Sequence, residues 1–149
     1  MRWVFLVFWS AIATQVSASE PGRIVIDKAM IREAPNAGAV TAGYLWIHNG
    51  SGSNDVLTGA ITELASEVQI HEMHMADGVM SMREVEGGVM IPSGETVFLA
   101  PRGLHLMIMN TTVNMPAGTP VPITLTFQNS GPIPVEFIAQ PLGVIMKAQ

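Results

Sequence analysis

The sequence predicts an all-β fold, an antiparallel sandwich or barrel, and two observations lead to this prediction. Short runs rich in β-branched and other apolar residues are separated by clusters of Gly, Pro, Asn and Ser, and no long run has the period of an amphipathic helix. Within these runs apolar and polar residues tend to alternate, as in a strand with one face on a core. Many short strands at this spacing are typical of antiparallel sandwiches and barrels.

The individual strands follow from these runs. They are expected at residues 23–31, 40–48, 56–64, 67–73, 79–85, 96–100, 105–109, 121–128 and 135–139. The alternation is clearest in 121–128, where the apolar positions are Val121, Ile123, Leu125 and Phe127. Asp77-Gly78 is the strongest hairpin signal, because both residue types tolerate the positive φ angles of a tight primed turn.

The first residues have the pattern of an export signal. Arg2 supplies a positive charge, residues 3–13 are apolar, and Val16-Ser17-Ala18 has the small-x-small form that signal peptidase recognises. An apolar stretch of about eleven residues is shorter than the roughly 20 that span a bilayer. We therefore expect a cleaved signal peptide at 1–18, a single domain at 19–149, a periplasmic location and no stable membrane insertion after cleavage.

The composition excludes several classes of function. Apolar residues make up 48% of the 149 residues and charged residues 13%, which is typical of a packed globular domain. A net charge of −5 repels phosphates, so no nucleic-acid partner is expected. The chain has no cysteine, which excludes disulfides, thiol catalysis, thiolate metal ligands and lipid attachment through an N-terminal Cys.

Histidine and methionine gather in one quarter of the chain. Three of the four histidines and seven of the eleven methionines lie between residues 71 and 109. In 104–109 the period of two gives two chemically different strand faces. One face carries Leu104, Leu106 and Ile108, and the other carries His105, Met107 and Met109. The aliphatic face can supply the core contact, which leaves an imidazole and thioethers free on the opposite face.

A second run of the same kind lies earlier in the chain. His71, Met73 and Met75 share one strand face, and Met80 and Met82 share a face after the predicted hairpin turn. Three segments can therefore bring two histidines and several methionines to one place. The face pattern alone leaves open which of Met80 and Met82 takes part.

Other polar residues near these runs have simpler expected roles. His74 has the opposite parity to His71, so its imidazole is expected at the surface. His48 lies at a strand end beside Asn49-Gly50 and is expected to be hydrogen-bonded or to face solvent. Glu72 is a candidate for orienting His71 or His105 through a hydrogen bond.

The softness of the ligands decides which metal such a cluster would bind. A thioether is soft and uncharged, so it binds Mg²⁺ and Ca²⁺ poorly and favours Cu(I), while imidazole suits copper in either oxidation state. Zinc prefers His, thiolate or carboxylate. Methionine is also a common filler of β-protein cores, so Met73, Met75, Met80 and Met109 are individually more often packing residues than ligands.

The segment from His71 to Arg83, followed by His105-Leu106-Met107, resembles the signature of the periplasmic copper chaperone family called PCuAC. That signature is a His, ten residues, a Met, about twenty-one residues, then His-x-Met. Ten residues separate His71 from Met82, and twenty-two separate Met82 from His105. The additional residue has a natural place in the predicted Gly87-Gly88 turn. The resemblance extends over nearly the whole mature chain, to Gly43–Asn49 and to the Glu136–Gly143 segment, which ends in Gln140-Pro141-Leu142-Gly143.

The resemblance implies a cupredoxin-like antiparallel β-sandwich that holds Cu(I) through His71, Met82, His105 and Met107. It also implies a metallochaperone that delivers copper to the copper-centre subunit of cytochrome c oxidase or to another copper chaperone. We expect the protein to be a monomer. Some members carry a His- and Met-rich C-terminal tail. This chain ends in Met146-Lys147-Ala148-Gln149, so a second site in the tail is not expected.

Three other interpretations compete with a copper chaperone. A blue-copper electron carrier needs a Cys thiolate, which this chain lacks. An enzyme is not expected, because the sequence has no nucleophile elbow or phosphate loop, and soft neutral ligands are poorly suited to activating water. The third interpretation is a metal-free extracytoplasmic β-sandwich that uses its methionine surface to contact another protein.

Overall fold

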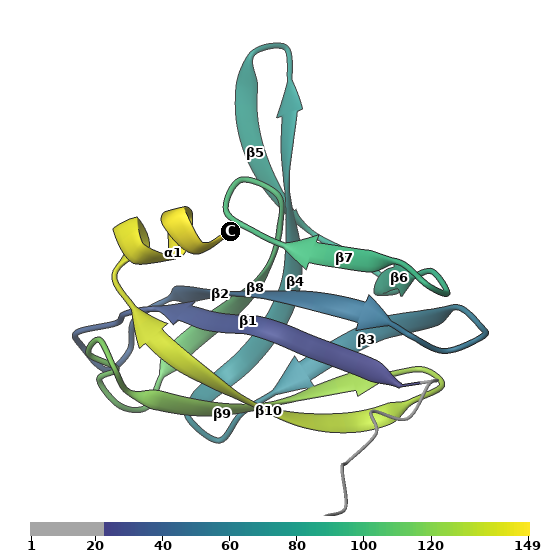
Figure 1. Cartoon of the computed structure of the whole chain (residues 1–149). Coiled ribbons are helices and arrows are strands. Elements are labelled where there is room, and N and C mark those ends of the chain that lie inside the picture. The colour runs from purple at the N-terminus through teal and green to yellow at the C-terminus, as the bar shows by residue number, and fades with distance from the viewer. Residues whose placement is uncertain (1–22) are drawn as a thin grey trace, which may run out of the picture.

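The computed structural model describes residues 23–149. The expected signal peptide, residues 1–18, lies outside the described residues. The strands in chain order are β1 (Ile24–Arg32), β2 (Thr41–Asn49), β3 (Asp55–Ile61), β4 (Ala65–Ala76), β5 (Val79–Glu84), β6 (Val89–Ile91), β7 (Thr96–Leu99), β8 (Leu104–Thr111), β9 (Pro120–Phe127) and β10 (Gly131–Gln140), followed by the helix α1 (Leu142–Ala148). The predicted all-β, cupredoxin-like antiparallel fold is confirmed (Figure 1).

The strands follow one hydrogen-bonded path that folds over a shared core. Its order is β5-β4-β8-β2-β1-β10-β9-β3-β6, with β7 paired to β2. Every pairing is antiparallel except that between β1 and β10, which is parallel and joins Met30–Arg32 to Ile138–Gln140. Residues from both halves of the path fill the core between them; among those with no exposed surface are Leu45, Ile47, Leu57, Leu106, Ile108, Leu125 and Phe137.

Two elements were not predicted from the sequence, and strands β4, β8 and β10 are longer than expected. Strand β6 has three residues and helix α1 has seven, which is too short for either period to be visible. Strand β10 begins at Gly131 although Pro132 and Pro134 lie within it. Both prolines are tolerated because β1 pairs only with the last residues of β10. At the two prolines the edge of β10 toward β1 has no partner strand, so no backbone N–H is needed there.

Helix α1 packs against the sheet by burying Ile145. The chain end is held by Trp46, whose indole Nε1 donates a hydrogen bond to Oε1 of Gln149 at 3.0 Å. Among the described residues, no helix combines the length and the hydropathy needed to cross a membrane.

The β4–β5 hairpin projects beyond the body of the sheet (Figure 1). Strand β4 continues three residues past the predicted end at Met73, and the turn is the predicted Asp77-Gly78, with φ angles of 52° and 75°. Positive φ at both central residues is the geometry of a type I′ turn, whose twist matches that of the two strands. The lower part of β4 is held in the sheet by β8, while β5 has β4 as its only strand neighbour along the path.

Candidate metal centre

Two histidines and one methionine of the two predicted runs, His71, His105 and Met82, meet where the β4–β5 hairpin leaves the sheet. His71 of β4 lies directly opposite His105 of β8, and the two rings are 6.0 Å apart at their centroids. Directly opposed residues of an antiparallel pair project to the same face. The other face of β8 lies on the core, where Leu106 and Ile108 have no exposed surface. The alternation predicted for 104–109 is therefore present, and it turns His105 away from the core.

His105 is held in one orientation by the backbone. The residue is only 5% exposed, and its Nδ1 lies 3.0 Å from the carbonyl oxygen of Gly103. Because a carbonyl oxygen can only accept, Nδ1 carries the proton and donates this bond. In the neutral ring Nε2 then has a free lone pair, and this atom lies 3.1 Å from the Sδ of Met82. A thioether sulfur has no proton to offer, so a neutral His105 brings two electron-pair donors together.

His71 is oriented by a chain of side-chain hydrogen bonds. Its Nε2 lies 2.7 Å from Oε1 of Gln69, and Nε2 of Gln69 donates to Oε1 of Glu67 at 2.8 Å. The proton of His71 is therefore on Nε2. Its Nδ1 is shielded from solvent and has no hydrogen-bond partner among the described residues. An unpartnered buried nitrogen is unfavourable in a folded protein, and a bound cation would satisfy it.

The pKa of His71 is lowered from its ordinary value. Burial of the ring is the main cause, the nearby His105 adds to it, and Glu84, which lies opposite His71 on β5, acts in the reverse direction. The lowered pKa favours the neutral ring, so the Nδ1 lone pair of His71 is available at neutral pH.

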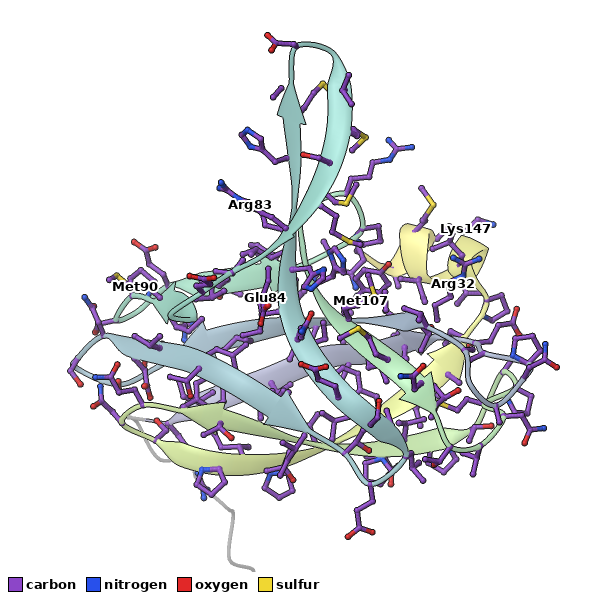
Figure 2. The ribbon with its side chains drawn as sticks, turned by 180° about the vertical axis from the view of Figure 1, so that it is seen from behind. Arg32, Arg83, Glu84, Met90, Met107 and Lys147 are labelled. Atoms are coloured by element: carbon purple, nitrogen blue, oxygen red, sulfur yellow. The ribbon has the colours of Figure 1, made fainter. Side chains whose placement is uncertain are left out.

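The two methionines differ in how closely they approach the histidines. Met82 of β5 contacts His105 directly and is 45% exposed, so this side chain joins the buried imidazole to the surface. Met107 is half-buried and lies one same-face step from His105 along β8, opposite Gln69 of β4. Such a step is about 7 Å at the backbone, a distance that a flexible thioether side chain can span. Figure 2 shows Met107 on β8 beside β4.

The structure distinguishes Met82 from Met80, which the face pattern left open. Met82 contacts His105, whereas Met80 lies two residue pairs nearer the hairpin tip, opposite Met75. The expected surface positions of His74 and His48 are confirmed, and Nδ1 of His48 lies 3.0 Å from the hydroxyl of Thr96.

The suggestion that Glu72 orients one of the histidines is wrong. Glu72 lies on the opposite face of β4 and forms an ion pair with Arg83 at 3.2 Å. Gln69 orients His71 instead. Its one signal in the sequence is that it shares the strand parity of His71, and parity does not say which rotamer reaches the ring.

The donor set at this place is neutral and soft. It offers the lone pairs of two neutral imidazoles and a thioether, with a second thioether on the next same-face position. No group of three or more His, Cys, Asp or Glu side chains is placed to hold a metal ion anywhere in residues 23–149. Thioether sulfur favours soft monovalent ions over hard or divalent ones, so the arrangement suits Cu(I) or Ag(I).

Comparison with solved structures identifies the fold. The copper-bound PCuAC domain from PmoF2 is 23% identical to this chain with a TM-score of 0.66, and the match covers 82% of this chain and 96% of that domain. The solution structure of CuI-DR1885 from Deinococcus radiodurans is 25% identical with a TM-score of 0.56, covering 77% of this chain and 78% of that one. The fold is therefore that of PCuAC domains, as the sequence resemblance implied.

Sequence comparison places the chain in a family. A protein of Leifsonia xyli subsp. xyli (strain CTCB07), described as putative lipoprotein Lxx21020, is 31% identical over 129 residues, which are 84% of this chain and 76% of the relative. The family model described as putative lipoprotein LpqE-like matches residues 24–139, from the start of the first strand to the last but one residue of β10. The chain belongs to the LpqE-like family.

Proposed function

We propose that this protein is an exported Cu(I) chaperone that binds one copper ion through His71, Met82, His105 and Met107. The observation that carries the proposal is the contact of 3.1 Å between Nε2 of His105 and the sulfur of Met82, with the ring of His71, whose buried Nδ1 has no hydrogen-bond partner among the described residues, 6.0 Å from that of His105. In each ring a hydrogen bond fixes the proton on the other nitrogen, which is Nε2 in His71 and Nδ1 in His105. Such bonds orient a metal-binding histidine before the metal arrives.

The charge of the ligands supports a carrier rather than an enzyme. Two neutral imidazoles and two thioethers leave the single charge of Cu(I) uncompensated, which favours release by ligand exchange. A site of this kind is poorly suited to activating water as a Lewis acid does. The ion is therefore cargo, and the partly exposed Met82 provides the side from which an acceptor can take it.

The comparisons support copper as the cargo and an extracytoplasmic location. The PCuAC domain from PmoF2 is described as copper-bound and the Deinococcus radiodurans protein as CuI-bound, and the family is one of putative lipoproteins. Lipid attachment to this chain would need another route, because the sequence contains no cysteine. We propose a periplasmic monomer that delivers copper to the copper-centre subunit of cytochrome c oxidase or to another copper chaperone.

Competition with a Cu(I) chelator tests the binding site. The parent protein is expected to retain one equivalent of Cu(I), and His105→Ala and Met82→Leu are each expected to weaken binding by at least one order of magnitude, because loss of a ligand costs more than the 10–100-fold loss typical of a supporting residue. Met90→Leu is the matched control, because Met90 is an exposed methionine on β6, far from the hairpin (Figure 2).

The second candidate function is a metal-free module that contacts another protein. The exposed apolar side chains of Met75, Val79 and Met80 at the hairpin tip favour it, since exposed apolar patches often mark interaction sites. If His105→Ala and Met82→Leu held copper as tightly as the parent, the chaperone proposal would be rejected in favour of this one.

A further inference from the structure

The projecting hairpin carries four methionines in two cross-strand pairs on one face. Met73 lies opposite Met82, and Met75 lies opposite Met80. We call Met73 and Met82 the inner pair, and Met75 and Met80 the outer pair. Directly opposed residues have Cβ atoms about 4.5–5.5 Å apart, and successive pairs on one face are about 7 Å apart along the strand. Each pair therefore offers two thioethers that can meet on one ion.

Packing does not account for the outer pair. Met75 is 63% exposed and Met80 is 47% exposed, and every residue of β5 is exposed. The opposite face of the hairpin carries His74 and Ser81 between the two methionine pairs, and the Glu72–Arg83 ion pair lies next to the inner pair. Figure 2 shows sulfur atoms along one side of the hairpin and Arg83 on the other side. The methionines are thus confined to the face that leads down to the histidines.

The inner pair connects the outer pair to the buried histidine. Met82 belongs to the inner pair and is also the residue whose sulfur lies 3.1 Å from Nε2 of His105. His105 is only 5% exposed. The methionine face therefore forms a continuous series of soft donors from the solvent-exposed tip of the hairpin to the imidazole beneath it.

We propose that Met75 and Met80 form a second, weaker site for Cu(I), through which the ion passes between solvent or an acceptor and the centre at His105. The inference rests on the proposed function and adds to it the path by which the copper ion enters and leaves the centre. In each step a new Cu–S bond forms before a Cu–S or Cu–N bond on the other side breaks. The ion keeps its charge, and the ligands exchange without the movement of an electron or a proton.

Silver titration of the whole protein labelled at its methionine methyl groups tests the outer site directly. Ag(I) has the charge and softness of Cu(I) and does not oxidise in air. The first equivalent is expected to shift the methyl signals of Met82 and Met107, and the second those of Met75 and Met80. Zn²⁺ is expected to shift neither outer signal, because it gains little from thioethers.

The double variant Met75→Leu/Met80→Leu tests the route. Leucine keeps the volume and apolar character of both side chains but removes the sulfur. The variant is expected to bind the first equivalent of Cu(I) as the parent does and to transfer it to a competing chelator several-fold more slowly. Met90→Leu again serves as the control, since it removes one exposed sulfur that lies outside the hairpin.

The two proposals fail in different ways. The outer site would be overturned if two equivalents of Ag(I) shifted the signals of Met82 and Met107 but not those of the outer pair. It would also be overturned if the double variant and Met90→Leu transferred copper at equal rates. Either result would leave the proposed function intact. Shifts at Met75 and Met80 without any at Met82 would overturn both the route and the proposed function.

Discussion

At the scale of single residues, the centre depends on which nitrogen of each histidine carries the proton. His105 is fixed by a backbone carbonyl and His71 by a side-chain amide. The backbone cannot be substituted away, whereas the amide of Gln69 can. Gln69 does not have to touch the metal ion to affect its binding, because it determines whether Nδ1 or Nε2 of His71 is free.

Replacing Gln69 with Leu is expected to release the ring of His71. Both neutral tautomers then become populated, and Cu(I) affinity is expected to fall by roughly 10–100-fold, the loss typical of a residue that supports a metal ligand. Nitrogen chemical shifts of His71 in the metal-free protein report the tautomer, and chelator competition reports the affinity. Gln128→Leu, at an exposed position, is the control. An unchanged tautomer in the Gln69 variant would contradict this role.

The lowered pKa of His71 predicts how stability changes with pH in the metal-free protein. An unperturbed histidine titrates near 6.5, so between the lowered folded pKa and about 6.5 the unfolded chain binds more protons than the folded one. The free energy of unfolding therefore falls as the pH is lowered through this window, with a contribution of at most about 1.4 kcal/mol per pH unit. Urea denaturation from pH 7.5 to 5 measures it. His71→Gln should flatten the dependence, and identical slopes would refute the assignment.

At the scale of elements, the hairpin is a separate unit held by its own turn. Its face toward the histidines carries Met82, yet β5 has no buried residue and contributes nothing to the core. The position of Met82 over His105 is therefore set by the register of β4 and β5 and by the turn that fixes this register.

Replacing Gly78 with Val is expected to weaken the hairpin and the centre together. Gly78 has a φ of 75° and open space around its Cβ position, so the cost is backbone strain alone, about 1–2 kcal/mol. Faster hydrogen exchange of β5 amides and weaker Cu(I) binding are expected. Gly38→Val is the matched control, with a φ of 78° and similar open space in a loop away from β5. Equal losses of copper affinity in both variants would show that the turn has no specific role.

Much of this element-scale structure was predictable from the sequence. Strand parity predicted that His105 would face away from Leu106, and the Asp77-Gly78 turn chemistry predicted the hairpin. The extension of β4 to Ala76 is marked only by the alternation of His71, Met73 and Met75, and nothing in the sequence sets its end, because the hairpin tip does not pack on the core. The role of Gln69 depends on a rotamer and on cross-strand neighbours, which parity does not specify. The identity of the four metal ligands stays a prediction.

At the scale of the whole molecule, the centre joins a rigid part of the fold to a weakly held one. Strand β8 is anchored by Leu106 and Ile108 in the core, while β5 pairs with β4 alone among the described strands and has no buried residue. Local opening of β5 can therefore separate Met82 from His105 without unfolding the sandwich. Release of the ion would then follow the opening of the hairpin rather than the much rarer global unfolding.

Copper binding is accordingly expected to stabilise the hairpin and the whole fold by different routes. At a free ligand concentration 1,000 times the dissociation constant, the gain in global stability is about 4 kcal/mol, and it appears as a higher Tm. In hydrogen exchange, the amides of β5 should gain protection in proportion to Cu(I) saturation, because their opening breaks the Met82 contact. Local openings of β9 do not involve the centre, so copper should not change the exchange rate of amides that exchange through them. Copper should slow the exchange only of those β9 amides that exchange through global unfolding. Uniform protection of β5 and β9 would mean that the hairpin does not open independently, and that the ion leaves by some other movement.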